Sequence, residues 1–449
     1  MRLRKTITTI VATAILLAGW QLFAVIANQP ELIPSLPRLV RTLCEWLVSG
    51  SFYQSVGATI FRGILGMSIS FVCAIGMAGL FARFEWVYEL FRPLLAIMRS
   101  IPVISFILLA LIFLNPESIP LMIAFLTMFP LLTENLTRGI LDLRPGLSIM
   151  ARQFHIKRSN VLFQIIYPQL KPFLYSGLAS AAGFGWRAII MGEVLSQCAF
   201  GIGSEMKRAQ NFIAVPELLA WTIVAVFISF FFDKGISKVA DITPKISFAN
   251  EDQTIPTPTL SVLDTKDISY QYGIQHFSHS FQKGIIYGIS APSGKGKTTL
   301  LNLIGGILLP TEGEIHPTRH FGIATIFQQP QLLPHLTAEE NIILPLSSFL
   351  TEEKARRIAQ KHLQEMEMEP FGNRYPKELS YGQQQRIAIA RALAYPSPLL
   401  LMDEPFKGLD EALSHRIIER IREKQMKEER IILFTSHNPD EIRLLADEV

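Results

Sequence analysis

Residues 284–300 read GIIYGISAPSGKGKTTL, and this stretch decides the fold of the second half of the chain. The apolar run 285–289 predicts a buried parallel strand, and the apolar segment 300–307 predicts a helix. Between them lies a loop that contains Gly294 and Gly296. Glycines let backbone N–H groups converge on an anion, and the helix N-terminus adds partial positive charge. The stretch therefore predicts a phosphate-binding site.

The side chains of this loop suit a nucleoside triphosphate and its metal ion. Lys297 can reach the β- and γ-phosphates, and the Thr298 hydroxyl can bind Mg²⁺. The first glycine of the usual pattern is Ala291 here, so a chance glycine turn is an alternative for the loop alone. The residues assigned to nucleotide binding are Ser293, Gly294, Lys295, Gly296, Lys297, Thr298 and Thr299.

Composition predicts two domains of opposite character. The chain has 449 residues, of which 49% are hydrophobic and 18% charged, which suits neither a wholly soluble nor a wholly membrane protein. All five tryptophans lie in the first half, whereas the polar motifs lie in the second. The net charge of +4 accompanies many apolar runs, so we relate it to membrane topology rather than to nucleic acid.

The first half predicts a six-helix membrane domain, since a spanning helix needs about 20 mostly apolar residues. The basic N-terminus is read as the flank of a retained first span, because no small-residue cleavage site follows it. The six candidates are 7–27, 60–81, 90–114 with an interruption at Pro102, 119–132, 173–195 and 218–232.

The distribution of basic residues predicts the orientation of this domain. Arginines and lysines concentrate in the N-terminus, the stretch 138–171 and the segment 234–245, so these are expected in the cytoplasm together with the second half. Arg187 and Glu193 fall within the fifth span. Charges there either line a translocation path or form an internal pair that stabilises packing, and the sequence favours neither reading.

A polar, proline-containing stretch, 246–259, predicts a linker between a membrane domain at 1–245 and a second domain at 260–449. From residue 260 short apolar strands alternate with helices, which predicts an α/β fold with a parallel sheet. The charged stretch 351–378 is interpreted as a solvated helical subdomain.

Polar residues end three further predicted strands of this sheet. Gln328 follows the run 321–327, and its amide can bind Mg²⁺ or position water. Asp403 and Glu404 follow the run 399–402, where Asp403 suits the Mg²⁺ shell and Glu404 suits a base that polarises water. His437 follows the run 431–434 and can touch a γ-phosphate.

Taken together, these motifs resemble those of ATP-binding-cassette (ABC) proteins. The stretch LSYGQQQRIAIARAL, residues 379–393, resembles their Leu-Ser-Gly-Gly-Gln signature, with Tyr381 in place of the first glycine. The resemblance implies that Ser380, Gly382 and Gln383 contact ATP held by a second copy of the chain. It also implies that Tyr272 stacks on adenine and that Lys297, Glu404 and His437 serve catalysis. In the stretch FKGLD, 406–410, a usual serine-alanine step is altered to Lys407-Gly408.

The first half resembles the permeases of type I ABC importers, especially those of the nitrate, sulfonate and taurine type. The loop 150–168 matches their ATPase-docking loop at Ala151 and Pro168 and departs from it at Ile149 and His155. We read this loop as an amphipathic helix that ends before Pro168. The chain stops about a dozen residues after His437, where such ATPases usually continue.

The resemblance implies a fused permease and ATPase in a bacterial inner membrane. Two copies would bind ATP with Mg²⁺ and import a small polar solute delivered by an extracytoplasmic binding protein. The solute class would be a sulfonate, taurine, nitrate or a thiamine-precursor-like compound. Two alternatives stay open, an ABC exporter and a membrane-anchored, ATP-dependent regulator without transport.

Overall fold

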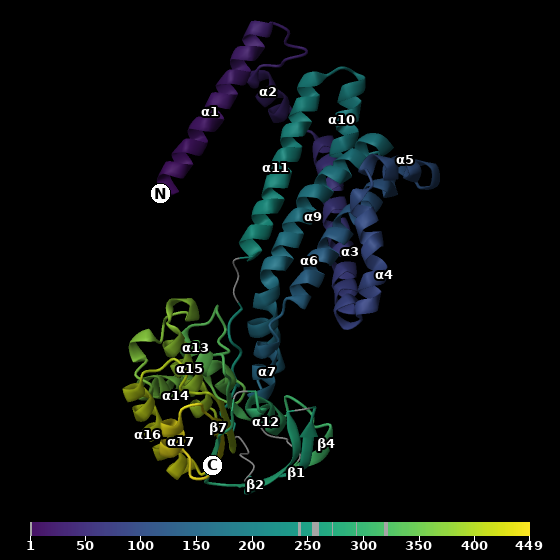
Figure 1. The fold of residues 1–449 in the computed structure, drawn as a ribbon. Helices are drawn as coiled ribbons and strands as arrows, with labels where there is room; N and C mark the ends of the chain where they lie inside the picture. The colour runs from purple at the N-terminus through teal and green to yellow at the C-terminus, as the bar shows by residue number, and fades with distance from the viewer. Residues whose placement is uncertain (1, 241–243, 254–259, 272, 293, 318–321) are drawn as a thin grey trace. The chain divides into compact units, whose positions relative to one another are not determined.

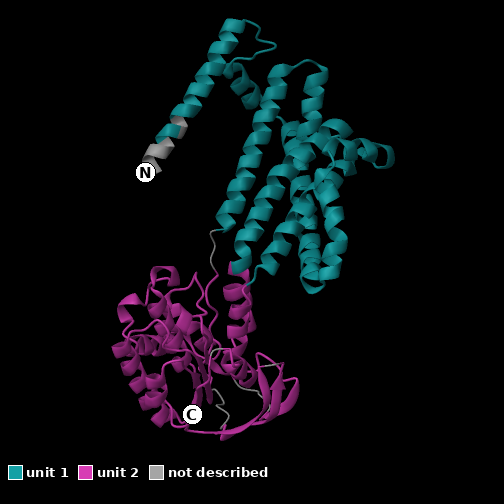
Figure 2. Cartoon of the chain, viewed as in Figure 1, with its two compact units in different colours: residues 1–143, 169–243 teal, residues 144–168, 244–449 magenta. Residues whose placement is uncertain are grey.

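A computed structural model describes residues 2–240, 244–253, 260–271, 273–292, 294–317 and 322–449. The contacts within the chain divide it into two compact units (Figure 2), residues 1–143 with 169–243 and residues 144–168 with 244–449. The contact units differ from the division predicted from sequence in two respects. Residues 144–168 interrupt the first unit along the chain but pack with the second, and the second unit resumes at residue 244 and not at 260.

The first unit is helical (Figure 1). Its elements are α1 (Arg2–Ala27), α2 (Leu36–Trp46), α3 (Gly50–Arg83), α4 (Glu85–Ser100), α5 (Val103–Phe113), η1 (Pro116–Ser118), α6 (Ile119–Leu141), α9 (Tyr167–Ser196), α10 (Ile202–Asn211) and α11 (Val215–Ala240). Four stretches of the described part of the chain are long and apolar enough to cross a membrane by length and composition: α3, η1 with α6, Arg158–Ser196, which ends with α9, and α11.

The other two of the six predicted spans do not form single long apolar helices in the described part of the chain, which gives four spans or at most five. Helices α4 and α5 are bent by 94° to each other and give a fifth span if the pair is counted as one. The break lies at Pro102, as predicted, because a proline disfavours helical geometry in the residue before it. Residues Val11–Ala27 of α1 form a shorter apolar helix.

Small residues let the helices of the first unit approach closely. A Cβ at Gly66 of α3 would lie only 2.7 Å from the Cβ of Ala124 in α6. A Cβ at Gly63 would lie 3.5 Å from the Trp186 ring of α9. Close helix packing of this kind replaces the hydrophobic driving force that is missing in lipid.

The second unit contains two sheets, which together with the helical first unit confirm the predicted fold class. The parallel sheet has the order β3-β7-β6-β5, and the antiparallel sheet has the order β2-β1-β4. The strands are β1 (Val262–Tyr270), β2 (Ile274–Gln282), β3 (Ile286–Ile289), β4 (Glu312–His316), β5 (Ala324–Ile326), β6 (Leu399–Asp403) and β7 (Ile431–Thr435). The antiparallel sheet was not predicted, because the exposed residues of its strands make them weakly apolar.

Helices pack on these sheets, and the parallel strands contribute buried residues to two apolar clusters. The helices are α12 (Lys297–Ile304), α13 (Ala338–Leu346), α14 (Glu352–Glu365), α15 (Tyr381–Ala394), α16 (Glu411–Glu428) and α17 (Pro439–Leu445), with 3-10 turns η3 (Glu369–Phe371) and η4 (Pro376–Glu378). The helix expected at 300–307 begins three residues earlier, because the chain turns into it at Gly296. The strand expected at 321–327 is shorter, at β5.

The stretch 144–168 does not form the single amphipathic helix that we predicted. It consists of α7 (Pro145–Gln153), α8 (Arg158–Asn160) and the π-helix η2 (Val161–Ile166), which continues into α9. The chain turns after α7 at His155, whose φ of 46° is left-handed and cannot continue a helix. Residues Leu147, Met150, Phe154 and Ile165 are fully or nearly fully buried in the core of the second unit.

Candidate functional site

The predicted phosphate loop has the backbone that its glycines allow. Gly294 and Gly296 have φ of 81° and 85°, which side chains rarely tolerate. A Cβ at Gly296 would also lie 2.8 Å from the carbonyl oxygen of Gly273. Lys295 is exposed and Thr299 is half-buried at the start of α12. The loop therefore leads directly into the N-terminal end of α12, where N–H groups lack helical partners.

Lys297 is folded back into this loop. Its side chain is largely buried, and its Nζ donates a hydrogen bond of 2.5 Å to the carbonyl oxygen of Ala291. The same Nζ lies 3.3 Å from Nδ1 of His437. Lys297 thus contacts both Ala291, which stands at the position of the pattern's first glycine, and His437, the histidine predicted to follow the last strand.

The carboxyl ends of β6 and β7 bring together a set of oxygen ligands. The Thr298 hydroxyl donates to one carboxylate oxygen of Asp403 at 2.9 Å, and the Thr435 hydroxyl donates to the other at 2.7 Å. A cavity of about 260 Å³ is lined by Thr298, Gln328 and Asp403. Hydroxyl, amide and carboxylate oxygens are the ligands that Mg²⁺ prefers, so these residues fit that ion.

Glu404 lies at the centre of the predicted catalytic residues. Its Oε1 accepts a hydrogen bond from Nε2 of Gln328 at 3.3 Å and lies 3.1 Å from Nε2 of His437. Its Oε2 lies 3.3 Å from Nζ of Lys407. Burial alone would raise the pKa of Glu404, but the hydrogen bond and charge of Lys407, with smaller effects of Gln328 and His437, lower that pKa below its ordinary value.

The signature-like segment begins α15. Ser380 is the N-cap of this helix, where its hydroxyl accepts from the Gln383 N–H at 3.3 Å and its own N–H donates to the Gln383 side chain at 2.9 Å. Among the described residues, no hydrogen bond or ion pair joins Ser380, Gly382 or Gln383 to the phosphate loop. The structure of one chain therefore does not bring this segment together with Lys297.

Two predicted residues, Tyr272 and Ser293, lie outside the described residues. Sequence reasoning missed Thr435, which holds Asp403, and Lys407, which pairs with Glu404. Thr435 is the last residue of β7 and directly follows the apolar run 431–434, so its polar side chain at the strand end was the available signal. The interaction of Lys407 with Glu404 spans one turn and carries no separate sequence signal.

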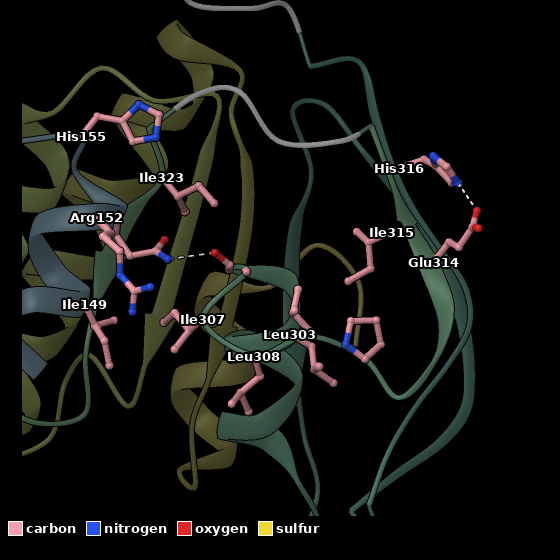
Figure 3. Close-up of a pocket in the computed structure, with 15 residues that line it drawn as sticks. Ile149, Arg152, His155, Leu303, Ile307, Leu308, Glu314, Ile315, His316 and Ile323 are labelled. Atoms are coloured by element: carbon pink, nitrogen blue, oxygen red, sulfur yellow. Dashed lines mark hydrogen bonds and ion pairs between the residues drawn. The ribbon is translucent and has the colours of Figure 1, made fainter. Parts of the chain in front are cut away.

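The segment 144–168 is fixed to the second unit at several points. The Gln153 side chain donates to the carbonyl oxygen of Gly305 at 2.8 Å, and its carbonyl accepts from the Ile323 N–H at 2.7 Å. A cavity of about 580 Å³ lies beside it (Figure 3), where Ile149 and Arg152 of α7 face Ile307. The sequence predicts a docking role for this segment, and these contacts show where it docks.

In the first unit, Glu193 is buried and paired with an arginine that the sequence reading did not consider. Arg62 Nη1 lies 2.7 Å from Glu193, and the Thr59 hydroxyl and the Gly203 N–H donate to the same carboxylate at 3.0 and 2.9 Å. Arg187, by contrast, is exposed on the surface of this unit. Glu193 therefore belongs to an internal network.

A glycine loop, an Asp-Glu pair and a histidine at one edge of a parallel sheet define a P-loop nucleotide-binding domain, which here shares its chain with apolar helices. Two family models match the chain, "ABC transporter" at residues 274–407 and "Binding-protein-dependent transport system inner membrane component" at residues 66–233. The chain belongs to the ABC transporter family and combines a permease domain of the binding-protein-dependent type with a cassette domain.

Curated relatives resemble the cassette half. The thiamine import ATP-binding protein ThiQ of Yersinia pseudotuberculosis is 35% identical over 199 residues, which cover 41% of this chain and 84% of that protein. The Fe(3+) ions import ATP-binding protein FbpC of Rhizobium etli is 36% identical over 39% of this chain and 53% of that protein. The chain spans about half the length of this FbpC and of the glucose import ATP-binding protein GlcV of Saccharolobus solfataricus, which is 35% identical.

The chain is also similar to a solved structure of a single cassette. The ATP-binding cassette MJ0796, in a dimeric post-hydrolysis state with ADP and Pi, is 31% identical. The match covers 40% of this chain and 90% of that chain, with a TM-score of 0.38.

Proposed function

We propose that the chain couples ATP hydrolysis to the import of a small polar solute. The observation that carries this proposal is the joint occurrence, in one chain, of an importer-type permease domain and a cassette with converging Thr298, Asp403 and Glu404 side chains. The alternatives are an exporter and a regulator without transport. The match to a binding-protein-dependent permease supports import.

The phosphate loop would hold the triphosphate. Backbone N–H groups of 294–299 would donate to the phosphates, and Lys297 would exchange its contacts with Ala291 and His437 for the β- and γ-phosphates. Tyr272 would stack on adenine, and Ser293 would complete the loop. Thr298, Gln328 and Asp403 would hold Mg²⁺, which neutralises phosphate charge when bound.

Hydrolysis would depend on positioned side chains of this chain. Glu404 would accept the proton of a water molecule as it attacks the γ-phosphate, and His437 would orient that water and the phosphate. Glu404 is well placed for this role because it follows a buried strand directly and is held at a left-handed φ of 47°. Catalysis by such a site consists mainly of positioning and electrostatic stabilisation.

A second copy of the chain would complete the site. Ser380 and Gln383 cap α15, so further N–H groups of its first turn remain for a phosphate from the partner. Gly382 would permit that approach. We further propose an inner-membrane location, with the cassette in the cytoplasm and an extracytoplasmic binding protein as the donor of solute.

The solute is proposed as a sulfonate, taurine, nitrate or a thiamine-precursor-like compound. Relatives of the cassette are named for iron, glucose, spermidine/putrescine and thiamine import. These relatives match only the cassette half, so the proposed solute class depends on the permease resemblance alone. A thermal-shift screen of the cognate binding protein with a sulfonate, taurine, nitrate and a thiamine-precursor-like compound would test the proposed solute class. A shift with a lipid-like compound only would contradict that proposal.

The hydrolysis proposal is tested on the purified full chain in lipid nanodiscs. We expect ATPase activity that rises with loaded binding protein, falls at least a hundredfold in Glu404→Gln and disappears in Lys297→Ala, because removal of one charge-stabilising group costs about 10²–10³ in rate. Lys377→Ala, an exposed lysine of the same unit, is the matched control. Retained ATP binding in Lys297→Ala would contradict the assignment of the phosphate loop.

A further inference from the structure

A closed network of contacts links the start of α15 to Glu404. The Tyr381 hydroxyl donates to the main-chain carbonyl of Gln328 at 2.8 Å. The Gln328 amide donates to Oε1 of Glu404 at 3.3 Å, and Lys407 Nζ lies 3.3 Å from Oε2. Both oxygens of the carboxylate are therefore engaged within one chain.

The network is closed by the residue after Lys407. Gly408 has a left-handed φ of 80°, and a Cβ there would lie 2.7 Å from the Tyr381 ring. A Cβ at Gly382 would in turn lie 2.6 Å from the carbonyl oxygen of Gly408. The tyrosine ring thus fits against a backbone that only glycine allows at that distance.

We propose that Tyr381 is a positioning residue that, with Lys407, restrains Gln328 and Glu404 in the nucleotide-free chain and so limits basal ATP hydrolysis. The inference rests on the proposed function. Gln328 on Oε1 and Lys407 on Oε2 hold the carboxylate of Glu404 in its present orientation, so these contacts must loosen before it can turn toward an attacking water. Tyr381 acts through the Gln328 backbone and not on the nucleotide.

One further side chain faces the same carboxylate, and a second lies behind it. His437 Nε2 lies 3.1 Å from Glu404, and Lys297 contacts His437 from the phosphate loop. Both belong to the proposed binding site and would turn toward phosphate when ATP binds. Tyr381 and Lys407 have no such role, so their removal is expected to change the restraint and not the ATP contacts.

The restraint is tested first without ATP, by hydrogen–deuterium exchange on the full chain in nanodiscs. Tyr381→Phe removes only the hydroxyl, and exchange in peptides 327–330 and 381–384 is expected to become about fivefold faster, the equivalent of one lost hydrogen bond. Tyr375→Phe is the matched control, because Tyr375 is 40% exposed and Tyr381 is 41% exposed. Exchange in Tyr381→Phe equal to that of the wild type would overturn the proposal.

The second measurement is steady-state ATPase activity without binding protein. We expect Tyr381→Phe and Lys407→Ala each to raise kcat about three- to tenfold with KM for ATP unchanged, and the double variant to gain less than the product of both factors, because the residues share one network. Unchanged or reduced kcat in both variants would overturn the proposal. Absence of ATPase in the wild type would refute the proposed function instead, and the exchange result would still decide whether the restraint exists.

Discussion

Asn160 holds three parts of the second unit together, and its removal gives the sharpest test of how segment 144–168 is docked. The residue is fully buried. Its Nδ2 donates to the Ser247 carbonyl and to the Ser347 hydroxyl, both at 2.8 Å, and its Oδ1 accepts from the Ser247 N–H at 2.8 Å. One side chain therefore joins the docked segment, the stretch after Pro244 and the end of α13.

The expected cost of Asn160→Ala follows from these contacts. Each hydrogen bond contributes about 1 kcal/mol, and buried partners left unsatisfied add to the cost, so we expect a loss of about 3 kcal/mol. For a unit of this size, about 1 kcal/mol corresponds to roughly 2–4 °C, so the Tm of the second unit should fall by about 6–12 °C. Asn160→Asp places a buried carboxylate oxygen against the Ser247 carbonyl and should cost at least as much as alanine.

The assay can distinguish the two units because all five tryptophans lie in the first. Calorimetry on the detergent-solubilised full chain records both transitions, whereas tryptophan fluorescence records the first unit. We expect Asn160→Ala to shift the calorimetric transition of the second unit and leave the fluorescence transition in place. Asn373→Ala, an exposed asparagine of the second unit, is the control. A shift in Asn160→Ala no larger than in Asn373→Ala would refute the reasoning.

Two further predictions concern buried sites. Burial and the charge of nearby Lys424 lower the pKa of His362 from 6.5 to about 3. As pH falls, His362 is therefore protonated in the unfolded chain before it is protonated in the folded chain. The free energy of unfolding decreases below about pH 6.5, by about 2 kcal/mol between pH 7.5 and 5. Calorimetry should find a smaller pH-dependent fall of Tm in His362→Gln, and an equal fall would contradict the assignment. In the first unit, Gly66→Leu should lower the fluorescence Tm by several degrees, because even a Cβ meets Ala124 at 2.7 Å. Gly76→Leu, where no atom lies within 4 Å of a Cβ, should leave it nearly unchanged, and equal shifts would count against the close packing of α3 and α6.

The parts of the fold that sequence predicts well are those with a strong local pattern. Apolar runs that end in a polar residue correctly predicted β6 and β7, because a strand covered on both faces is apolar throughout. The glycine loop could be predicted equally well, since the positive φ at Gly294 and Gly296 favours glycine at these positions.

The parts that sequence does not predict depend on partners far away in the chain. Arg62 and Glu193 are 131 residues apart, and only the packing of α3 against α9 brings them to 2.7 Å. The turn at His155 likewise interrupts a stretch whose apolar periodicity continues through it. Tyr381 looks like a departure from a signature, whereas its hydroxyl has a partner 53 residues away.

The burial of 144–168 has a consequence for how the two halves stay associated. The chain enters the second unit at residue 144, leaves it at 168 and returns at 244. Leu147, Met150 and Phe154 lie in that unit's core, and the stretch after Pro244 is bound to Asn160. An engineered protease cleavage between 253 and 260 would therefore leave two polypeptides that still elute together as one particle. Covalent fusion fixes their one-to-one ratio at synthesis, and we expect the buried docking segment to retain that ratio after cleavage.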